Sequence, residues 1–373
     1  MTELPMGFYE RVIYTLRSLY SRYGYSQYKM SKFEEYDLYA RNRDFLISDS
    51  VITFTDANGK LMALKPDVTL SIVKNSKDAP ETLQKLYYNE NVYRAPKGSR
   101  SFLEMTQVGL ECLGKVDNYC ICEVLILAAQ SLRSISGNSV LNISHLGLLA
   151  DLLAGVGIPE NSKAEAFKAV GEKNTHALEK ICRDANISEE CIALLKQVVA
   201  ASGAPDGVLP VIRQAMDGLA PIGALEDLLT ITAALKGTPV YEMLRFDLSV
   251  VDDVNYYNGI VFKGFIDGVP SSVLSGGQYD KLMQKMGRKS CAIGFAVYLD
   301  TLERLEQREK AYDVDAVLLY EEGAELPVLL SRADELTQQG CTVTVLQQLP
   351  ENIRYRQLMK LRGSEVEILE NNA

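Results

Sequence analysis

Histidine is scarce in this sequence of 373 residues: it occurs only at His145 and His176. None of the seven cysteines forms a C-x-x-C pair with another. Zinc sites are usually built from closely spaced Cys and His ligands, so no metal site is expected. An odd number of widely spaced cysteines also favours reduced thiols, which are typical of cytosolic proteins, over a disulfide framework.

Long apolar segments are missing as well. The N-terminal sequence MTELPMGFYERVIYTLRSLY has no apolar core of the kind that signal peptides carry. The chain has no run of about 18 uncharged apolar residues, so it lacks the pattern of a membrane-spanning helix. We therefore expect a cytoplasmic protein without a membrane partner.

Basic side chains are fewer than acidic side chains in this sequence. The chain has 39 Lys and Arg residues against 49 Asp and Glu residues, which gives a net charge of −10. Affinity for the phosphate backbone rests mainly on clustered Lys and Arg side chains, so nucleic acid is a disfavoured partner. The charge balance fits a small-molecule ligand or a protein partner better.

The length and the apolar pattern predict two or three domains with a mixed α+β fold. A helical stripe begins at Phe8, and Asn58-Gly59 marks the turn of a hairpin over residues 49–64. Two strands are expected next, at about residues 85–94 and 102–113, with a turn between them at residues 96–99. A helix should follow at about residues 119–134.

The amino-acid composition changes twice in the second half of the chain. Residues 161–236 are rich in Ala, Leu, Glu and Lys, which predicts an all-helical insertion. Strand-like runs return from Tyr241, and a helix, a short strand and a helix are expected at about residues 279–286, 291–296 and 297–308. The segment from Val314 onward has the pattern of a strand, a helix and a second strand, and a further helix and strand should follow. We expect a main domain over residues 1–310 and a small α/β domain over residues 311–373.

The strand FLEMTQVGLECLG carries an unusual face. Side chains alternate along a strand, so Gln107, Gly109 and Glu111 share one side, while Val108 and Leu110 share an apolar side. A glycine within a strand often marks the close approach of a ligand or of another backbone. An amide and a carboxylate about 13 Å apart on either side of it indicate a polar pocket. A solvated strand face is the other interpretation of this strand by itself.

Three further segments combine polar side chains with turns. In LKPDVT, Asp67 and Thr69 follow the end of a strand, where an acidic residue can also simply cap the next helix. In DVNYYNGIVF, Tyr256 and Tyr257 are expected to point to opposite sides of a hairpin, with one of them in the core. In SGGQYDKL, the glycine pair lets the backbone turn tightly or approach a ligand. Taken singly, each segment also fits an ordinary structural role.

Together, these segments resemble motifs of the histidyl-tRNA synthetase family in their order, spacing and residue types. LKPDVT is similar to its L-R-P-[ED]-x-T, and YRAPKGSRSFLEMTQVGLECLG to its motif 2, which ends in Q-x-G-x-E-x-x-G. DVNYYNGIVF, SGGQYDKL and AIGFAVYLDTLERL resemble R-G-L-D-Y-Y-x-x-x-x-F, G-G-R-Y-D-x-L and motif 3. The resemblance covers about residues 6–305. It implies a class II synthetase-like fold, an antiparallel sheet flanked by helices, followed by a shortened form of the family's anticodon-binding domain.

The resemblance also implies a pocket of the histidine type. The residues that match positions around the α-amino group of histidine are Asp67, Thr69 and Gln107. Glu111 and Tyr257 match positions around the imidazole, and Tyr279 matches a tyrosine of the same pocket. Tyr256 and Arg94, the retained first arginine of motif 2, complete the candidate set. Such roles make chemical sense, because a cationic amine needs carboxylate and amide acceptors and an imidazole N–H needs a carboxylate.

The same resemblance implies that chemistry on ATP has been lost. Adenylation of an amino acid builds negative charge on phosphorus, which fixed cations must stabilise. Positions that hold arginine in the family are occupied by Asp252 and Thr301, and a third falls near Leu103. We therefore expect no catalytic residues, no cofactor and no aminoacylation.

A paralogue family has this pattern: the regulatory subunits of ATP phosphoribosyltransferase, which acts in the first step of histidine biosynthesis. Resemblance to that family implies a short-form catalytic subunit as partner, L-histidine as a feedback effector, and a homodimer within a hetero-oligomer. Two alternatives remain open on the sequence. One is another synthetase-like adapter or tRNA sensor, and the other is a working histidyl-tRNA synthetase.

Overall fold

The computed structural model describes residues 6–46, 51–95, 101–251, 256–305 and 312–372. The chain divides into two compact units. One consists of Tyr9–Leu302, and the other of Glu303–Ala373 together with Met1–Phe8. The combination of helices with sheets confirms the predicted α+β class.

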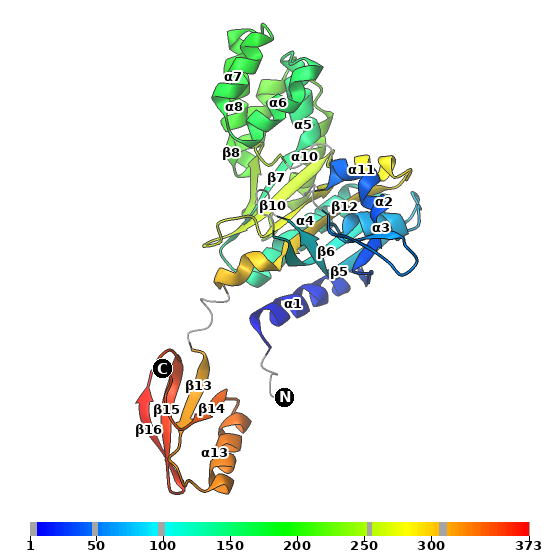
Figure 1. The fold of residues 1–373 in the computed structure, drawn as a ribbon. Helices are drawn as coiled ribbons and strands as arrows, with labels where there is room; N and C mark the ends of the chain where they lie inside the picture. The colour runs from blue at the N-terminus through cyan, green and yellow to red at the C-terminus, as the bar shows by residue number, and fades with distance from the viewer. Residues whose placement is uncertain (1–5, 47–50, 96–100, 252–255, 306–311, 373) are drawn as a thin grey trace. The chain divides into compact units, whose positions relative to one another are not determined.

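A nine-stranded sheet forms the centre of the larger unit (Figure 1). Its pairs from β5 through β6, β12, β11 and β10 to β7 are all antiparallel, as the predicted class II-like sheet requires. The pairs β1–β5 and β7–β9 at its two sides are parallel. In spatial order the strands are β1 (Ser26–Gln27), β5 (Leu83–Arg94), β6 (Leu103–Gly114), β12 (Cys291–Tyr298), β11 (Leu274–Gln278), β10 (Ile260–Ile266), β7 (Ser139–His145), β9 (Leu244–Asp247) and β8 (Ser202–Gly203).

Two helices cover one face of this sheet: α1 (Phe8–Arg22) and α4 (Asn118–Ile135). The ring of Tyr20 on α1 meets Phe295 of β12 edge-on, with the ring centroids 5.9 Å apart. On α4, the side chain of Leu132 occupies the space beside Gly264 of β10, where a Cβ atom would lie 2.6 Å from it. The Tyr20 hydroxyl and Ser131 Oγ, 2.9 Å apart, join the two helices. This face is therefore closed by a packed core, and ligand access is left to the opposite face.

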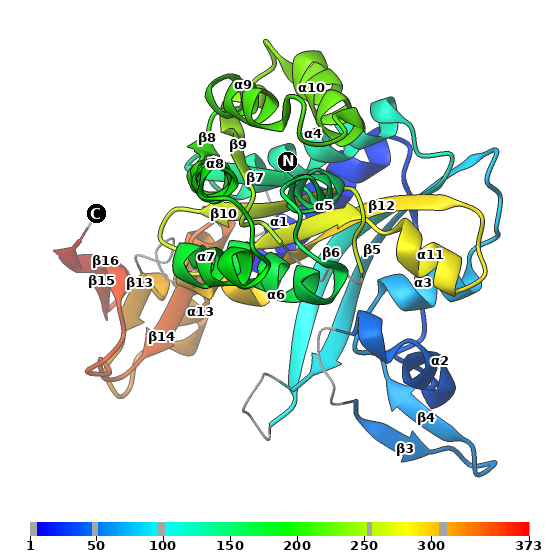
Figure 2. The same cartoon turned by 90° about the horizontal axis from the view of Figure 1, so that it is seen from above.

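A small antiparallel sheet lies beside the main one, with the order β2-β4-β3 (Figure 2). It contains the predicted hairpin, whose turn has Gly59 at a positive φ of 81° and Gly59 N–H donating to the Asp56 carbonyl. Glycine adopts such a φ without steric cost. The elements of this region are β2 (Phe33–Glu35), α2 (Tyr36–Arg41), the 3-10 helix η1 (Arg43–Phe45), β3 (Thr53–Thr55), β4 (Leu61–Leu64) and α3 (Thr69–Asn75).

A group of helices follows β7. They are α5 (Leu146–Gly155), α6 (Glu160–Gly171), α7 (Thr175–Asp184), α8 (Glu189–Ala200), α9 (Pro205–Met216) and α10 (Gly223–Leu235), and the 3-10 helix η2 (Tyr241–Met243) comes after them. The expectation of purely helical structure over residues 161–236 is wrong in one respect. Ser202 and Gly203 form the short strand β8, because their backbone groups pair with Asp247 and Phe246 of β9.

The end of the main sheet also differs from expectation. The predicted helix α11 is present over Asp280–Lys285. However, β12 extends to Tyr298 where a helix was expected from Val297, because Val297 and Tyr298 pair with Val108 and Gln107 of β6. A 3-10 helix, η3 (Leu299–Leu302), follows. The longer strand places the side chain of Tyr298 on the same face as Gln107.

The smaller unit is built on a four-stranded sheet with the order β14-β13-β15-β16. Its first part is the predicted βαβ, with β13 (Val314–Leu319), α13 (Leu326–Gln338) and β14 (Val343–Leu346), and with β13 and β14 parallel. The expected helix after β14 is wrong. That segment forms β15 (Tyr355–Arg362), which pairs with both β13 and β16 (Glu365–Asn371), so pairing within the sheet overrides a locally helix-compatible sequence.

Candidate ligand-binding site

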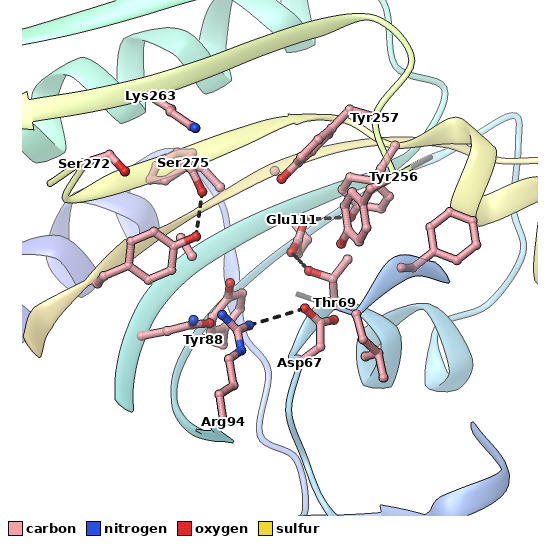
Figure 3. A pocket seen from close by; sticks show the side chains of 18 residues that line it. Asp67, Thr69, Tyr88, Arg94, Glu111, Tyr256, Tyr257, Lys263, Ser272 and Ser275 are labelled. Atoms are coloured by element: carbon pink, nitrogen blue, oxygen red, sulfur yellow. Dashed lines mark hydrogen bonds and ion pairs between the residues drawn. The ribbon is translucent and has the colours of Figure 1, made fainter. Parts of the chain in front are cut away.

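A cavity of about 610 Å³ lies on the face of the main sheet opposite α1 and α4 (Figure 3). This volume is in the range of clefts that enclose small organic ligands. Its walls come from β5, β6, β10, β11 and β12, from the turn before α3, and from residues near η1 and before β10. All eight pocket residues expected from the sequence line it: Asp67, Thr69, Arg94, Gln107, Glu111, Tyr256, Tyr257 and Tyr279.

Glu111 of β6 is the buried acid of the cavity, with a relative exposure of 2%. Its carboxylate accepts two hydrogen bonds, one from Thr69 Oγ1 at 2.7 Å and one from the Tyr279 hydroxyl at 2.6 Å. A Cβ atom on Gly294, in the neighbouring strand β12, would lie 1.8 Å from Glu111 Oε2. Glycine at position 294 is therefore what makes room for the carboxylate.

Burial dominates the protonation of Glu111. It raises the pKa of this carboxyl group to about 8, although the hydrogen bonds from Tyr279 and Thr69 favour the charged form. The nearby Asp67 raises the Glu111 pKa further, because two carboxylates repel each other. Glu111 consequently holds a proton at neutral pH, and an N–H donor or a cation placed beside it would favour release of that proton.

Asp67 has both of the roles that its sequence context suggested. Its Oδ1 accepts a hydrogen bond of 2.8 Å from the backbone N–H of Leu70 in the first turn of α3. Its Oδ2 lies 3.8 Å from a terminal nitrogen of Arg94, whose Nε donates to the Pro66 carbonyl at 2.6 Å. Burial raises the pKa of Asp67, and the charge of Arg94 counteracts that rise. Helix capping and pocket lining therefore coexist in one side chain.

The two adjacent tyrosines do not point to opposite sides. Tyr256 and Tyr257 both line the cavity, with their ring centroids 4.7 Å apart. The alternation rule fails here because these residues lie before β10, outside regular strand structure. Tyr256 also meets Tyr279 at 5.8 Å and Phe45 at 6.0 Å between centroids. The result is a wall of aromatic rings beside Glu111, which suits a flat aromatic or cationic group.

Gln107 is buried, with a relative exposure of 3%, so the solvated-face interpretation of its strand is wrong. The close approach expected at Gly109 is present, but its partners belong to the protein. A Cβ atom there would lie 2.5 Å from the Tyr88 hydroxyl and 2.4 Å from the Phe295 carbonyl oxygen. The space above Gly109 is thus filled by Tyr88.

Two of the three positions expected to have lost catalytic arginines, Thr301 and Leu103, lie outside the cavity lining. Thr301 is in η3, where its Oγ1 donates to the Tyr298 carbonyl at 2.6 Å, and Leu103 is 49% exposed at the start of β6. Neither lines the cavity. Asp252 lies outside the described residues, as does the expected turn at residues 96–99.

Several lining residues were not anticipated. They include Tyr88, Lys263, Ser272, Ser275 and Tyr298. Alternation along β10 and β11 could have placed Lys263 and Ser275 on one face, since each sits among apolar or glycine neighbours. Tyr298 was missed because it was expected in a helix.

The described part of the chain has neither a cluster of metal ligands nor a helix suited to span a membrane. Among those residues, no three or more His, Cys, Asp or Glu side chains are grouped so that they could hold a metal ion. Within the same residues, no helix is both long enough and apolar enough to cross a membrane.

The sequence has clear relatives. A family model described as histidyl-tRNA synthetase matches residues 6–302. The protein from Oceanobacillus iheyensis named ATP phosphoribosyltransferase regulatory subunit is 24% identical over 306 residues, which cover 81% of this chain and 75% of that protein.

Solved structures show the same fold. A Bacillus halodurans protein described as an ATP phosphoribosyltransferase regulatory subunit/histidyl-tRNA synthetase superposes with a TM-score of 0.71 and 23% identity, and the match covers 96% of this chain and 98% of that one. A chain of the ATP phosphoribosyl transferase (HisG:HisZ) complex from Thermotoga maritima superposes with a TM-score of 0.60 and 20% identity, over 77% and 96% of the two chains. Since the family model spans both the main sheet and the cavity, the chain belongs to the histidyl-tRNA synthetase family.

Proposed function

We propose that this chain is a non-catalytic regulatory subunit of ATP phosphoribosyltransferase and that its cavity binds L-histidine as the effector. In this role it acts in the cytoplasm, in histidine biosynthesis, as a homodimer within a hetero-oligomer that includes the short-form catalytic subunit. The curated relative carries that name, and one neighbour of the same fold comes from a complex of that transferase.

The observation that carries the ligand assignment is the buried Glu111 carboxyl group beside an aromatic wall. An imidazole ring can stack on Tyr256 or Tyr257 while its N–H donates to Glu111. Asp67 and Gln107 offer oxygen acceptors to an ammonium group. One small molecule that presents an imidazole and an amine together is histidine.

The non-catalytic part of the proposal rests on charge. Adenylation needs cations around the reacting phosphate, and removing one such contact from an enclosed site typically costs several kcal/mol of transition-state stabilisation. The family's arginine positions hold Asp252 and Thr301 in this sequence, and a third falls near Leu103. The one retained arginine, Arg94, is held beside Asp67. We expect no histidine-dependent exchange of pyrophosphate into ATP.

Calorimetric titration of the purified chain with L-histidine, and separately with ATP, tests the ligand assignment. We expect binding of L-histidine without ATP and a loss of at least about tenfold in Glu111→Gln, because the amide removes the charge-assisted hydrogen bond. Glu189→Gln is the matched control, since Glu189 lies on α8 with its side chain 73% exposed.

Reconstitution with a short-form catalytic subunit tests the regulatory role. Transferase activity should require this chain, and L-histidine should inhibit the complex. If Glu111→Gln leaves inhibition by L-histidine unchanged while the complex assembles normally, the cavity is not the regulatory site. Measurable pyrophosphate exchange by the chain alone would overturn the non-catalytic assignment.

A further inference from the structure

The cavity has a second polar region, formed by residues that the histidine-type pocket does not use. It consists of Lys263 on β10, Ser275 on β11, Tyr298 on β12 and Ser272 just before β11. Lys263 and Ser275 are direct partners in the antiparallel ladder, which places their side chains next to each other on one face. Ser275 Oγ and the Tyr298 hydroxyl are 2.6 Å apart.

This region lies on the cavity side of the sheet. Figure 3 shows the Lys263 amine and the Ser272 and Ser275 hydroxyl groups on the side of the sheet that also presents Tyr257 and Glu111. The residue across the ladder from Ser275 is the small Ala296, which also lines the cavity. The space for a ligand group beside Lys263 therefore lies over Ser275 and Ala296, because the space above the next residue in the ladder, Gly109, is filled by Tyr88.

The two regions differ in chemistry, since one presents a carboxyl group and the other an amine. Lys263 is on β10 and Glu111 is on β6, with β11 and β12 between them. Three strand spacings amount to about 14 Å between the backbones of β10 and β6. Glu111 lies two residues farther along β6 than Gly109, the residue in register with Lys263. A ligand that lies across β11 and β12 would meet a carboxyl group at one end and an ammonium group at the other.

Arg94 is a second cation in the wall, but it is placed to serve the acidic end. Its Nε donates to the Pro66 carbonyl and its terminal nitrogen is 3.8 Å from Asp67 Oδ2. Its charge also counteracts the burial-driven rise in the Asp67 pKa. The partners of Arg94 thus tie it to Asp67.

We propose that Lys263, with the hydroxyl groups of Ser275 and Tyr298, receives the carboxylate of a zwitterionic amino acid whose imidazole N–H donates to Glu111. The ammonium group supplies charge and the hydroxyls supply neutral donors, which is the chemistry a carboxylate requires. The inference rests on the proposed function and names how the same cavity distinguishes an amino acid from other imidazoles.

This proposal is tested by comparing the binding of L-histidine and of L-histidinol to the unaltered chain and to Lys263→Met. L-histidinol has a hydroxymethyl group in place of the carboxylate of L-histidine. We expect Lys263→Met to lower affinity for L-histidine about 10- to 100-fold, the effect of one charge-assisted hydrogen bond. The same substitution should leave affinity for L-histidinol unchanged within about twofold, so that the two ligands bind the variant similarly. Lys263→Arg keeps a cation and should restore most of the preference for L-histidine.

Other results of these binding measurements would overturn the inference, and each would point to a different explanation. Equal losses for both ligands in Lys263→Met would mean that the lysine only supports the fold, and unchanged binding of L-histidine would place the carboxylate elsewhere. Arg94→Met should weaken both ligands alike, because Arg94 supports Asp67; a selective loss of L-histidine there would make Arg94 the anchor. If the unaltered chain binds neither ligand, alone or with the catalytic subunit, the proposed function fails and the inference fails with it.

Discussion

Two opposing influences act on the carboxyl group of Glu111. Hydrogen bonds from Thr69 and Tyr279 favour the carboxylate, whereas burial and the nearby Asp67 favour the neutral acid, and burial prevails. The Glu111 carboxyl group therefore holds a proton at a position where a ligand N–H would bind. Stability and ligand binding should both depend on pH through this one residue.

The first prediction concerns stability. The pKa of Glu111 is about 8 in the folded protein and near 4.5 when the chain is unfolded, so between these values the folded state binds the extra proton. Stability then falls as pH rises through this window. Relative to Glu111→Gln, the free energy of unfolding of the unaltered chain should drop by about 2 kcal/mol from pH 6 to pH 8. Urea denaturation of both proteins at pH 6 and pH 8 measures the free energy of unfolding. The same change with pH in the unaltered chain and in Glu111→Gln would contradict the prediction.

The second prediction concerns binding. A ligand that donates an N–H to Glu111 favours the carboxylate, so binding at pH 7 should release a proton from Glu111. The observed binding enthalpy should therefore change between phosphate and Tris buffers, which differ in ionisation enthalpy. In Glu111→Gln any remaining binding should lack this contribution. Identical buffer dependence in both proteins would assign the released proton to another group.

The third prediction concerns Gly294. A Cβ atom at this position would lie 1.8 Å from Glu111 Oε2 and 2.5 Å from the Leu110 carbonyl oxygen. We expect Gly294→Ala to cost about 1–3 kcal/mol of stability, as overpacking does. It should also abolish binding of L-histidine. Gly207→Ala in α9 is the control, because a Cβ atom there meets nothing within 4 Å and alanine favours helix. Equal stability of both variants would show that the sheet adjusts freely.

At the scale of secondary-structure elements, α4 illustrates how local sequence fixes a helix start. Asp117 Oδ1 accepts a 2.9 Å hydrogen bond from the backbone N–H of Cys120 and so caps the helix. Asp117→Ala should cost about 1 kcal/mol of stability, whereas Asp117→Asn should cost far less, because both Asp and Asn are good caps. Thermal unfolding compares the three proteins. Since the helix lies on the face away from the cavity, affinity for L-histidine should stay unchanged in both variants.

Elements with strong local signals were predictable. The hairpin around Gly59, the strands β5 and β6 and the helix α4 were all expected close to where they lie. The errors fall where pairing decides the structure. The strand β15 is held by β13 and β16 on its two sides, and the extension of β12 to Tyr298 is held by β6. Such partners are distant in sequence, so a local pattern does not reveal them.

The candidate site was predictable in part for the same reason. The eight expected residues stand in segments that resemble a known family, and all of them line one cavity. Lys263 and Ser275 carry no such resemblance. Their meaning depends on the register between β10 and β11, which the sequence alone did not supply. The filling of the space above Gly109 by Tyr88 also required the structure.

At the scale of the whole molecule, the cavity belongs to one unit. Every residue that lines it falls between Phe45 and Tyr298, inside the unit Tyr9–Leu302. The smaller unit has its own apolar cluster, which includes Leu318, Leu329 and Met359. Each unit therefore has a separate source of stability.

The fifth prediction follows from this division. A chain ending at Arg304 should fold and bind L-histidine with the affinity of the full chain, because it keeps the complete cavity and the main sheet. Calorimetry and circular dichroism on both chains test this. A folded but non-binding short chain would show that residues after 304 shape the cavity.

The floor of the cavity also limits how its specificity can change. Gly294 lines the cavity, whereas Gly109 and Gly277 lie against the lining residues Tyr88 and Tyr257. These glycines have no side-chain atoms to lose, and a Cβ atom at any of them would meet existing atoms within 3 Å. Mutation at these positions can only subtract volume. Selection for a larger ligand must therefore act on the walls, at residues such as Tyr88 or Phe45, so the paths by which this cavity could acquire a new ligand begin with truncation of an aromatic ring.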